Sequence, residues 1–111
     1  MKSKKQWLLI YSALFILVIF LMVLLYRHNE LLAALIVIIT VLGLKLSGER
    51  EDVHIYVVGA IVGTAAEIIA VSFGVWQYAN PTTLGIPLWL PFAWGAGAVL
   101  IKKLSELFQR G

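Results

Sequence analysis

The sequence of 111 residues contains no cysteine, and only 14% of its residues are charged. Without cysteine the chain cannot form a disulfide, a thiolate metal site or a cysteine nucleophile. Its cations are scattered along the chain rather than gathered with aromatic residues, so we expect no binding to nucleic acid. The chain also lacks a glycine-rich phosphate loop and a Ser-His-Asp pattern, and we expect no cofactor.

Apolar residues make up 61% of the chain, far above the share found in soluble domains. They form four segments, at about 7–26, 31–46, 53–74 and 87–104. A helix of about 20 residues is roughly 30 Å long, which is the thickness of the hydrocarbon layer. We therefore predict one all-α integral membrane domain over residues 1–111, a bundle of four transmembrane helices. The first segment is longer than the apolar core of a signal peptide, so we expect it to be retained.

The cations predict how this bundle is oriented. With the N-terminus in the cytoplasm, the outer segments hold Arg27 alone, and the inner segments hold the other eight cations: Lys2, Lys4, Lys5, Lys45, Arg50, Lys102, Lys103 and Arg110. This bias predicts a multi-pass protein of the cell membrane with both termini in the cytoplasm. His28 and His54 then lie on opposite sides of the bilayer, so we expect no metal site.

One carboxylate, Glu67, lies inside the third apolar segment, seven residues before Gly74. This spacing places it roughly 10 Å below the outer end of the helix. An ionised carboxylate at that depth costs several kcal/mol unless it is paired or hydrated, so such residues usually serve a function. We expect Glu67 to be the functional centre, protonated or hydrogen-bonded at neutral pH. The alternative is a structural glutamate that is hydrogen-bonded to a neighbouring helix.

Small residues share the helix face of Glu67. Gly59 and Gly63 precede it at intervals of four and form a G-x-x-x-G motif, which lets two helices approach closely. The fourth segment offers Gly95 and Gly97 as a matching small stretch. We predict close packing of the third and fourth helices at these glycines. Homodimerisation through the same face is the alternative.

The stretch 73–95 gathers three of the four tryptophans and all three prolines without a single charge. Trp76, Tyr78 and Trp89 fall at the predicted outer boundary, where an aromatic belt is the simplest interpretation. Trp94 would lie roughly 10 Å inside the fourth helix, at the depth of Glu67. Because a buried indole N–H needs an acceptor, we expect Trp94 to be the nearest neighbour of Glu67. The other aromatic residues would close this site from above.

Two prolines give the fourth helix two alternative starting positions. Pro87 suits a first helical position, where the missing N–H is not required. Pro91 follows one turn later and would tilt or kink a helix that begins at Pro87. The spanning helix therefore starts at either Pro87 or Pro91.

Part of this stretch resembles a known family. Glu67 is followed by FGVWQY at 73–78 and by GIPLWLPFAW at 85–94. A carboxylate, then F-G-x-aromatic-x-Y, then G-[VI]-P-x-x-[IL]-P-x-x-W resembles the membrane carotenoid-biosynthesis family that includes the bisanhydrobacterioruberin hydratases. The resemblance covers residues 67–94.

The resemblance implies the addition of water to a terminal C=C bond of a polyene. In that reaction Glu67 would be the catalytic acid that protonates the alkene, kept neutral by a dry site. Trp76 and Trp94 would stabilise the carbocation through their ring faces, and Tyr78 would position the water. With Trp89, these aromatic residues form the expected ligand-binding set.

The sequence is compatible with three functions. The first is an enzyme or binding protein that acts on a long apolar isoprenoid at Glu67. The second is a non-enzymatic membrane subunit that docks a partner through residues 73–95. The third is a small proton-coupled transporter, which the short chain and the single membrane carboxylate would suit. Because four helices form a thin bundle in the lipid bilayer, a cavity for a long ligand would require a homo-oligomer or a second membrane protein.

Overall fold

The computed structural model describes residues 3–109, apart from the side chains of Lys4 and Leu107. These residues form four helices in the order α1 (Lys4–Leu25), α2 (Asn29–Ser47), α3 (Arg50–Ser72) and α4 (Leu90–Gln109). The described part contains no strand, only an isolated bridge between Thr83 and Ile86. The predicted all-helical class with four helices is therefore confirmed. Three helices, α1, α2 and α3, are long and apolar enough to cross a membrane.

Local sequence signals set the ends of the first two helices. Ser3 caps α1 by accepting a hydrogen bond from the backbone N–H of Gln6 (3.2 Å), and the Gln6 side chain accepts one from the N–H of Ser3 (2.8 Å). This reciprocal pair satisfies two N–H groups that a helix start leaves free. At the end of α2, Gly48 adopts a left-handed backbone with φ of 65°, which glycine tolerates without strain.

The fourth helix starts at Leu90, between the two predicted starts. Residues 87–89 form a turn in which the N–H of Leu90 donates to the carbonyl of Pro87 (3.1 Å). Pro91 is therefore the second residue of α4, where no intrahelical acceptor exists for the N–H that proline lacks. The helix continues to Gln109, beyond the predicted end at 104.

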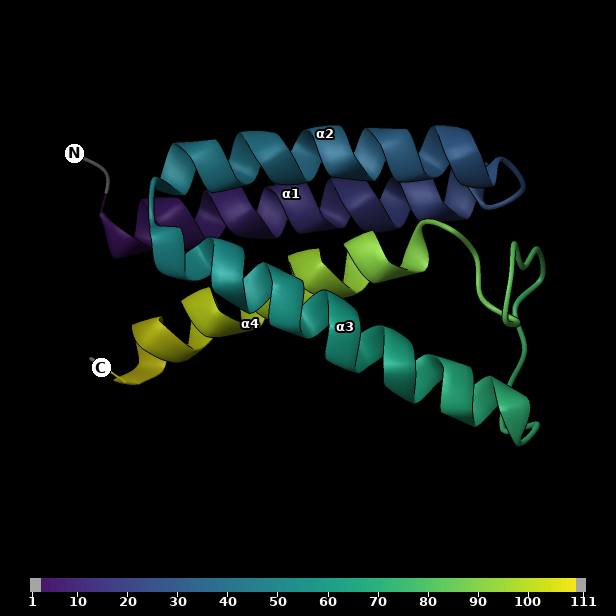
Figure 1. Cartoon of the computed structure of the whole chain (residues 1–111). Helices are drawn as coiled ribbons and strands as arrows, with labels where there is room; N and C mark the ends of the chain where they lie inside the picture. The colour runs from purple at the N-terminus through teal and green to yellow at the C-terminus, as the bar shows by residue number, and fades with distance from the viewer. Residues whose placement is uncertain (1–2, 110–111) are drawn as a thin grey trace.

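Helices α1 and α2 lie side by side and antiparallel, and α4 contacts both of them and crosses α3 (Figure 1). Helix α3 contacts mainly α4. It diverges from α1 and α2 toward its C-terminal end, and the chain then returns to α4 through the long loop 73–89 (Figure 1). The loop contributes to the core through Ile86 and Trp89, which pack with Val18, Leu32 and Ile36.

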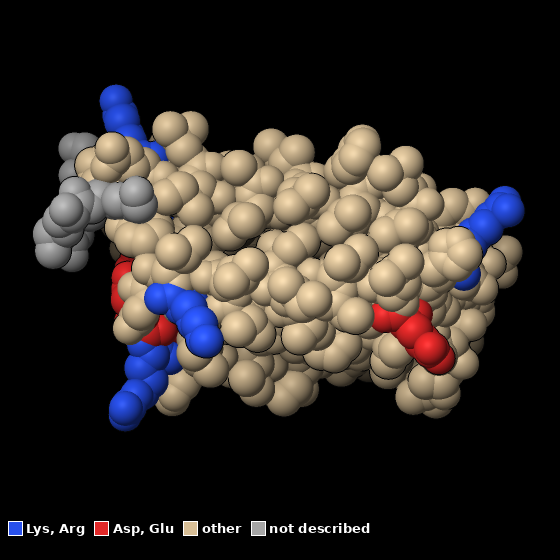
Figure 2. Space-filling view, turned by 90° about the horizontal axis from the view of Figure 1, so that it is seen from above, with Lys and Arg blue, Asp and Glu red and all other residues tan. Residues whose placement is uncertain are grey.

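The two ends of the bundle differ in charge. We call the end with loop 73–89 and the α1–α2 turn the loop end, and the end with the chain termini and the α2–α3 turn the charged end (Figure 1). In the view from above, Lys, Arg, Asp and Glu gather at the two ends and leave an uncharged band between them (Figure 2). Of the cations predicted on the inner side, Lys2 and Arg110 lie outside the described residues.

Candidate functional site

Glu67 lies on α3, and only 8% of its surface is exposed. Its Oε2 accepts two hydrogen bonds, from the indole N–H of Trp76 (2.9 Å) and from the hydroxyl of Tyr78 (2.6 Å). The indole can only donate, so this oxygen must be the acceptor. The other oxygen, Oε1, has no hydrogen bond to any residue in the described part of the chain. Of the two carboxyl oxygens, only Oε2 is thus held in place by donors from the described residues.

The chain folds back on itself to bring these donors to Glu67. After α3 ends at Ser72, the N–H of Gly74 donates to Val71 (3.0 Å) and the N–H of Val75 to Ala70 (3.0 Å). Gly74 has a φ of 75°, a left-handed conformation that glycine adopts without steric cost. The reversal directs residues 76–78 back along the last turns of α3 rather than away from the bundle.

A second set of contacts holds the loop against the α1–α2 turn. The Nδ2 of Asn29, the first residue of α2, donates to the carbonyl of Asn80 (2.8 Å) and to the hydroxyl of Thr82 (2.7 Å). The Thr82 hydroxyl also accepts from the N–H of Leu88 (3.0 Å). The loop is therefore fixed at both of its sides, to α3 through Glu67 and to α2 through Asn29.

Tyr78 connects Glu67 to the core. Its ring meets the ring of Trp89 edge-to-face, with centroids 6.3 Å apart and an angle of 88°. Trp89 is 5% exposed, and its indole N–H has no acceptor among the described residues. Burial of Tyr78, together with its hydrogen bond to Glu67 and the charge of Glu67, raises the pKa of the Tyr78 hydroxyl. Tyr78 therefore remains a hydrogen-bond donor throughout the neutral pH range.

Trp94 occupies a different place from the expected one. Its indole ring lies directly on Gly63, one helical turn before Glu67, where any side chain would collide with the ring. The hydrogen bonds to Glu67 come from Trp76 and Tyr78, so the expected hydrogen bond from the Trp94 indole to Glu67 is not formed. The reason is the backfolded loop, whose donors reach the carboxyl from the sequence immediately after α3. The ring of Trp94 remains 39% exposed beside the site.

The four glycines of the predicted contact between α3 and α4 touch other residues than one another. Gly59 and Gly63 do face α4, but they contact Ala98 and Trp94 rather than the α4 glycines. Gly95 leaves room for the ring of Tyr56 on α3 (2.7 Å from an added Cβ to Cε2). Gly97 faces Phe15 of α1 at 3.6 Å, so it belongs to another helix pair. The glycine face of α3 is therefore occupied by α4 of the same chain.

An ionic cluster at the charged end was not predicted. Asp52 is fully buried, with Lys102 bound to one carboxylate oxygen and Lys103 to the other (2.8 Å to Oδ2). Glu49 binds both lysines, at 3.4 Å to Lys102 and 3.0 Å to Lys103. Glu49 is also the N-cap residue of α3. The sequence contained a signal for this cluster. Acidic residues lie at the start of α3, and a Lys-Lys pair lies at the facing end of α4, which runs antiparallel to α3.

No group of three or more His, Asp or Glu side chains in the described part is arranged to hold a metal ion. Comparison with protein-family models, with curated proteins and with solved structures finds no match.

Proposed function

We propose that this chain is a multi-pass membrane protein that binds an apolar isoprenoid at Glu67, with four spanning helices and both termini in the cytoplasm. The molecule is 44 Å long, which fits a bilayer of about 40–45 Å including its headgroups. The charged end carries Lys5, Lys45 and Arg50, and the loop end carries Arg27. The rule that cations remain on the cytoplasmic side supports the proposed orientation.

Helix α4 is not among the three helices that are apolar enough by composition to cross a membrane, and the ionic cluster supports the proposal that it nevertheless does so. It has 20 residues, enough for roughly 30 Å. Its two lysines lie near the charged end and are paired with Asp52 and Glu49. Paired charges close to the interface cost far less than isolated charges at the bilayer centre.

The ligand proposal rests on one observation, a buried carboxyl that is bonded to one partly exposed indole and lies one helical turn from the glycine that a second indole covers. Trp76 is 48% exposed and hydrogen-bonded to Glu67. Trp94 of α4 is 39% exposed and packs on Gly63, one helical turn before Glu67 on α3. In a bilayer such surfaces would contact hydrocarbon chains. Indole faces pack well against a polyene and attract positive charge. A long isoprenoid could therefore approach from the lipid side with its end near Glu67.

The same arrangement suits acid-catalysed hydration, the reaction implied by the resemblance of residues 67–94. With Oε2 held by Trp76 and Tyr78, a proton on Oε1 would be free for transfer to the terminal alkene carbon. The C=C electron pair would form the new C–H bond and leave a tertiary carbocation beside the indole faces. Water would then form the C–O bond and return a proton to the carboxylate.

Mass spectrometry of lipids that co-purify with the protein tests the binding proposal. We expect the wild-type protein to retain a polyprenoid in near-stoichiometric amount and Trp94→Leu to lose most of it. Trp7→Leu is the matched control, because Trp7 lies at the charged end beside Tyr11. The Glu67→Gln variant should fold and retain ligand but should not hydrate it. Absence of any polyprenoid from the wild-type protein would contradict the proposal.

The alternative of a membrane subunit is favoured by one feature of the loop. Phe73, Val75 and Leu84 are 82%, 64% and 67% exposed, more than an aromatic belt requires. A stoichiometric protein partner in the same purification, lost when Phe73 and Leu84 are changed to serine, would favour this function over isoprenoid binding.

A further inference from the structure

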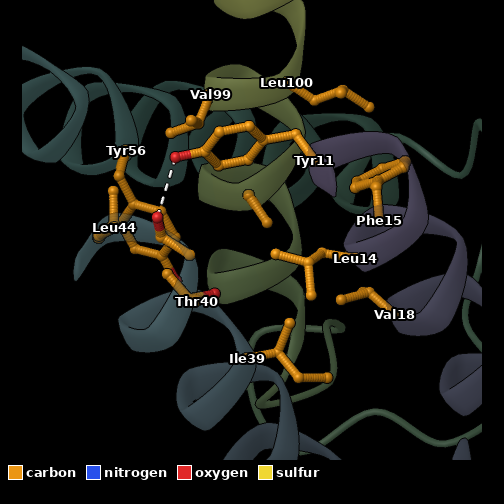
Figure 3. A pocket seen from close by; sticks show the side chains of 12 residues that line it. Tyr11, Leu14, Phe15, Val18, Ile39, Thr40, Leu44, Tyr56, Val99 and Leu100 are labelled. Carbon is orange, nitrogen blue, oxygen red and sulfur yellow. Dashed lines mark hydrogen bonds between the residues drawn. The ribbon is translucent and has the colours of Figure 1, made fainter. Parts of the chain in front are cut away.

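Two pockets of the molecule differ in their chemistry. The first lies where the four helices meet, and its wall is almost entirely hydrocarbon (Figure 3). The hydroxyl of Tyr11 in this wall already donates to the carbonyl of Gly43 (2.9 Å) (Figure 3). The second pocket lies at the loop end, has a volume of about 540 Å³ and is lined by charged and amide side chains. Of the two, the pocket at the loop end is therefore the one suited to a polar ligand.

The pocket at the loop end lies between two segments that are far apart in the sequence. It is lined by residues 27–31, from the α1–α2 turn into α2, and by residues 80–82 of the loop. The Nδ2 of Asn29 donates to the carbonyl of Asn80 (2.8 Å) and to the hydroxyl of Thr82 (2.7 Å), so the two walls are joined. The pocket is thus largely preformed, as small-ligand sites usually are.

Two exposed side chains of opposite charge, Arg27 and Glu30, line this pocket. Both kinds of charge appear at the loop end of the space-filling view (Figure 2). Neither side chain forms an ion pair with any residue that the structure describes. The Nε of Arg27 donates to the hydroxyl of Tyr26 (3.1 Å), and its two terminal nitrogens have no acceptor within the described part of the chain. One ligand could therefore meet both a guanidinium fork and a carboxylate here.

An exposed apolar stripe of α2 begins at the same pocket. Leu31 lines the pocket and is 51% exposed. Ala34, Ile38 and Leu42 follow at intervals of three and four residues, share its helix face and are exposed as well. The stripe is roughly 16 Å long at the helical rise. It favours a ligand that has a hydrocarbon chain attached to its polar end.

We propose that this pocket binds the headgroup of a phospholipid that carries both a phosphate and a primary ammonium group. The terminal nitrogens of Arg27 would donate to the phosphate oxygens, a pairing that suits the planar guanidinium. The ammonium group would donate to the carboxylate of Glu30, and an acyl chain would lie along the α2 stripe.

The inference rests on the proposed membrane function, in which the 44 Å molecule places its two ends among the lipid headgroups. It does not depend on Glu67, nor on the side of the membrane that the loop end faces.

Native mass spectrometry of the detergent-purified protein tests the proposal with two lipids. Dioleoyl phosphatidylethanolamine has both charged groups, and dioleoyl phosphatidylglycerol keeps the phosphate and the acyl chains but lacks the ammonium group. We expect the wild-type protein to bind the first lipid about fivefold more tightly, the effect of one exposed ion pair. Glu30→Gln should abolish this preference, and Arg27→Gln should weaken the binding of both lipids to a similar extent.

The matched controls are Glu51→Gln and Lys45→Gln, which make the same changes of charge at the charged end and should leave the preference intact. Equal binding of the two lipids by the wild-type protein, or a preference that persists in Glu30→Gln, would overturn the proposal. Soluble glycerophosphoethanolamine should displace the lipid only at far higher concentration. If it binds as tightly as the lipid, the site serves a soluble ligand and the lipid proposal is wrong.

The same spectra separate this proposal from isoprenoid binding at Glu67. Arg27→Gln and Glu30→Gln should leave the amount of retained polyprenoid unchanged, whereas Trp94→Leu should lower it without altering the preference between the two phospholipids. Either proposal can therefore fail while the other holds.

Discussion

The hydroxyl of Tyr78 donates to Oε2 of Glu67 across 2.6 Å, although eleven positions and the end of α3 separate the two residues. Trp76 donates to the same oxygen. The acid and the loop that covers it are therefore one hydrogen-bonded unit. Changes in the loop should affect the position of the carboxyl, and a substitution that removes the acceptor oxygen of Glu67 should release the loop.

Tyr78→Phe should loosen this unit without removing its ring contact with Trp89. Loss of a hydrogen bond to a buried carboxyl is expected to cost about 1–2 kcal/mol of unfolding free energy, measured by denaturation in detergent. The control is Tyr26→Phe, whose hydroxyl only accepts a hydrogen bond from the adjacent Arg27. Equal stability of Tyr78→Phe and the wild-type protein would contradict the role of this bond.

The same bond predicts a dependence on alkaline pH. The pKa of the Tyr78 hydroxyl is raised in the folded state, first by burial and then by Glu67. Its stabilising effect is therefore fully present below the unfolded pKa of about 10 and is lost as pH rises through the folded pKa. The tyrosinate absorbance of Tyr78→Phe should lack one late-ionising group that the wild-type protein has. A Tyr78 that titrates near pH 10 in the folded protein would be inconsistent with its burial.

Gly63→Ala should destabilise the fold, because the added methyl group would collide with the ring of Trp94. Overpacking of this kind costs about 1–3 kcal/mol, and the double variant Gly63→Ala with Trp94→Ala should remove the clash. The control is Gly97→Ala, whose methyl group would meet Phe15 at an ordinary 3.6 Å. Thermal unfolding of the variants measures the effect, and equal losses at both glycines would argue against the specific Trp94 contact.

Asp52→Asn should lower the free energy of unfolding, because Lys102 and Lys103 would lose their shared buried partner. Removing one partner of a buried ion pair costs about 3–5 kcal/mol. Glu51→Gln is the matched control, since Glu51 is 69% exposed and 3.8 Å from Lys102; it should change stability by less than about 0.5 kcal/mol. Similar unfolding curves for Asp52→Asn and Glu51→Gln would show that burial of the cluster contributes little.

The proposed orientation can be measured by cysteine labelling, because the chain has no cysteine of its own. Single cysteines at Ala79 in the loop and at Arg50 on α3 replace exposed residues. In intact cells an impermeant thiol reagent should label Ala79→Cys at once and Arg50→Cys only after the membrane is opened. The reverse pattern would invert the topology.

Several features follow from the sequence because they depend on neighbouring residues. Long apolar runs predict helices whose hydrogen bonds are all internal, and Gly48 ends α2 through its own left-handed backbone. The isolation of Glu67 in an apolar helix identified it as the residue to examine. Trp76 and Tyr78 follow this helix directly in the sequence, which predicts that they lie near its end.

The tertiary structure decided which groups meet. Trp94 and Trp76 are both indoles in one uncharged stretch, and their sequence positions do not reveal which of them reaches Glu67. The outcome depends on the reversal at Gly74, which returns the loop along α3. The ion pair of Asp52 with Lys102 joins residues 50 positions apart. Such contacts depend on how helices pack and rotate relative to one another, which is settled by side-chain shapes from the whole bundle rather than by any local pattern.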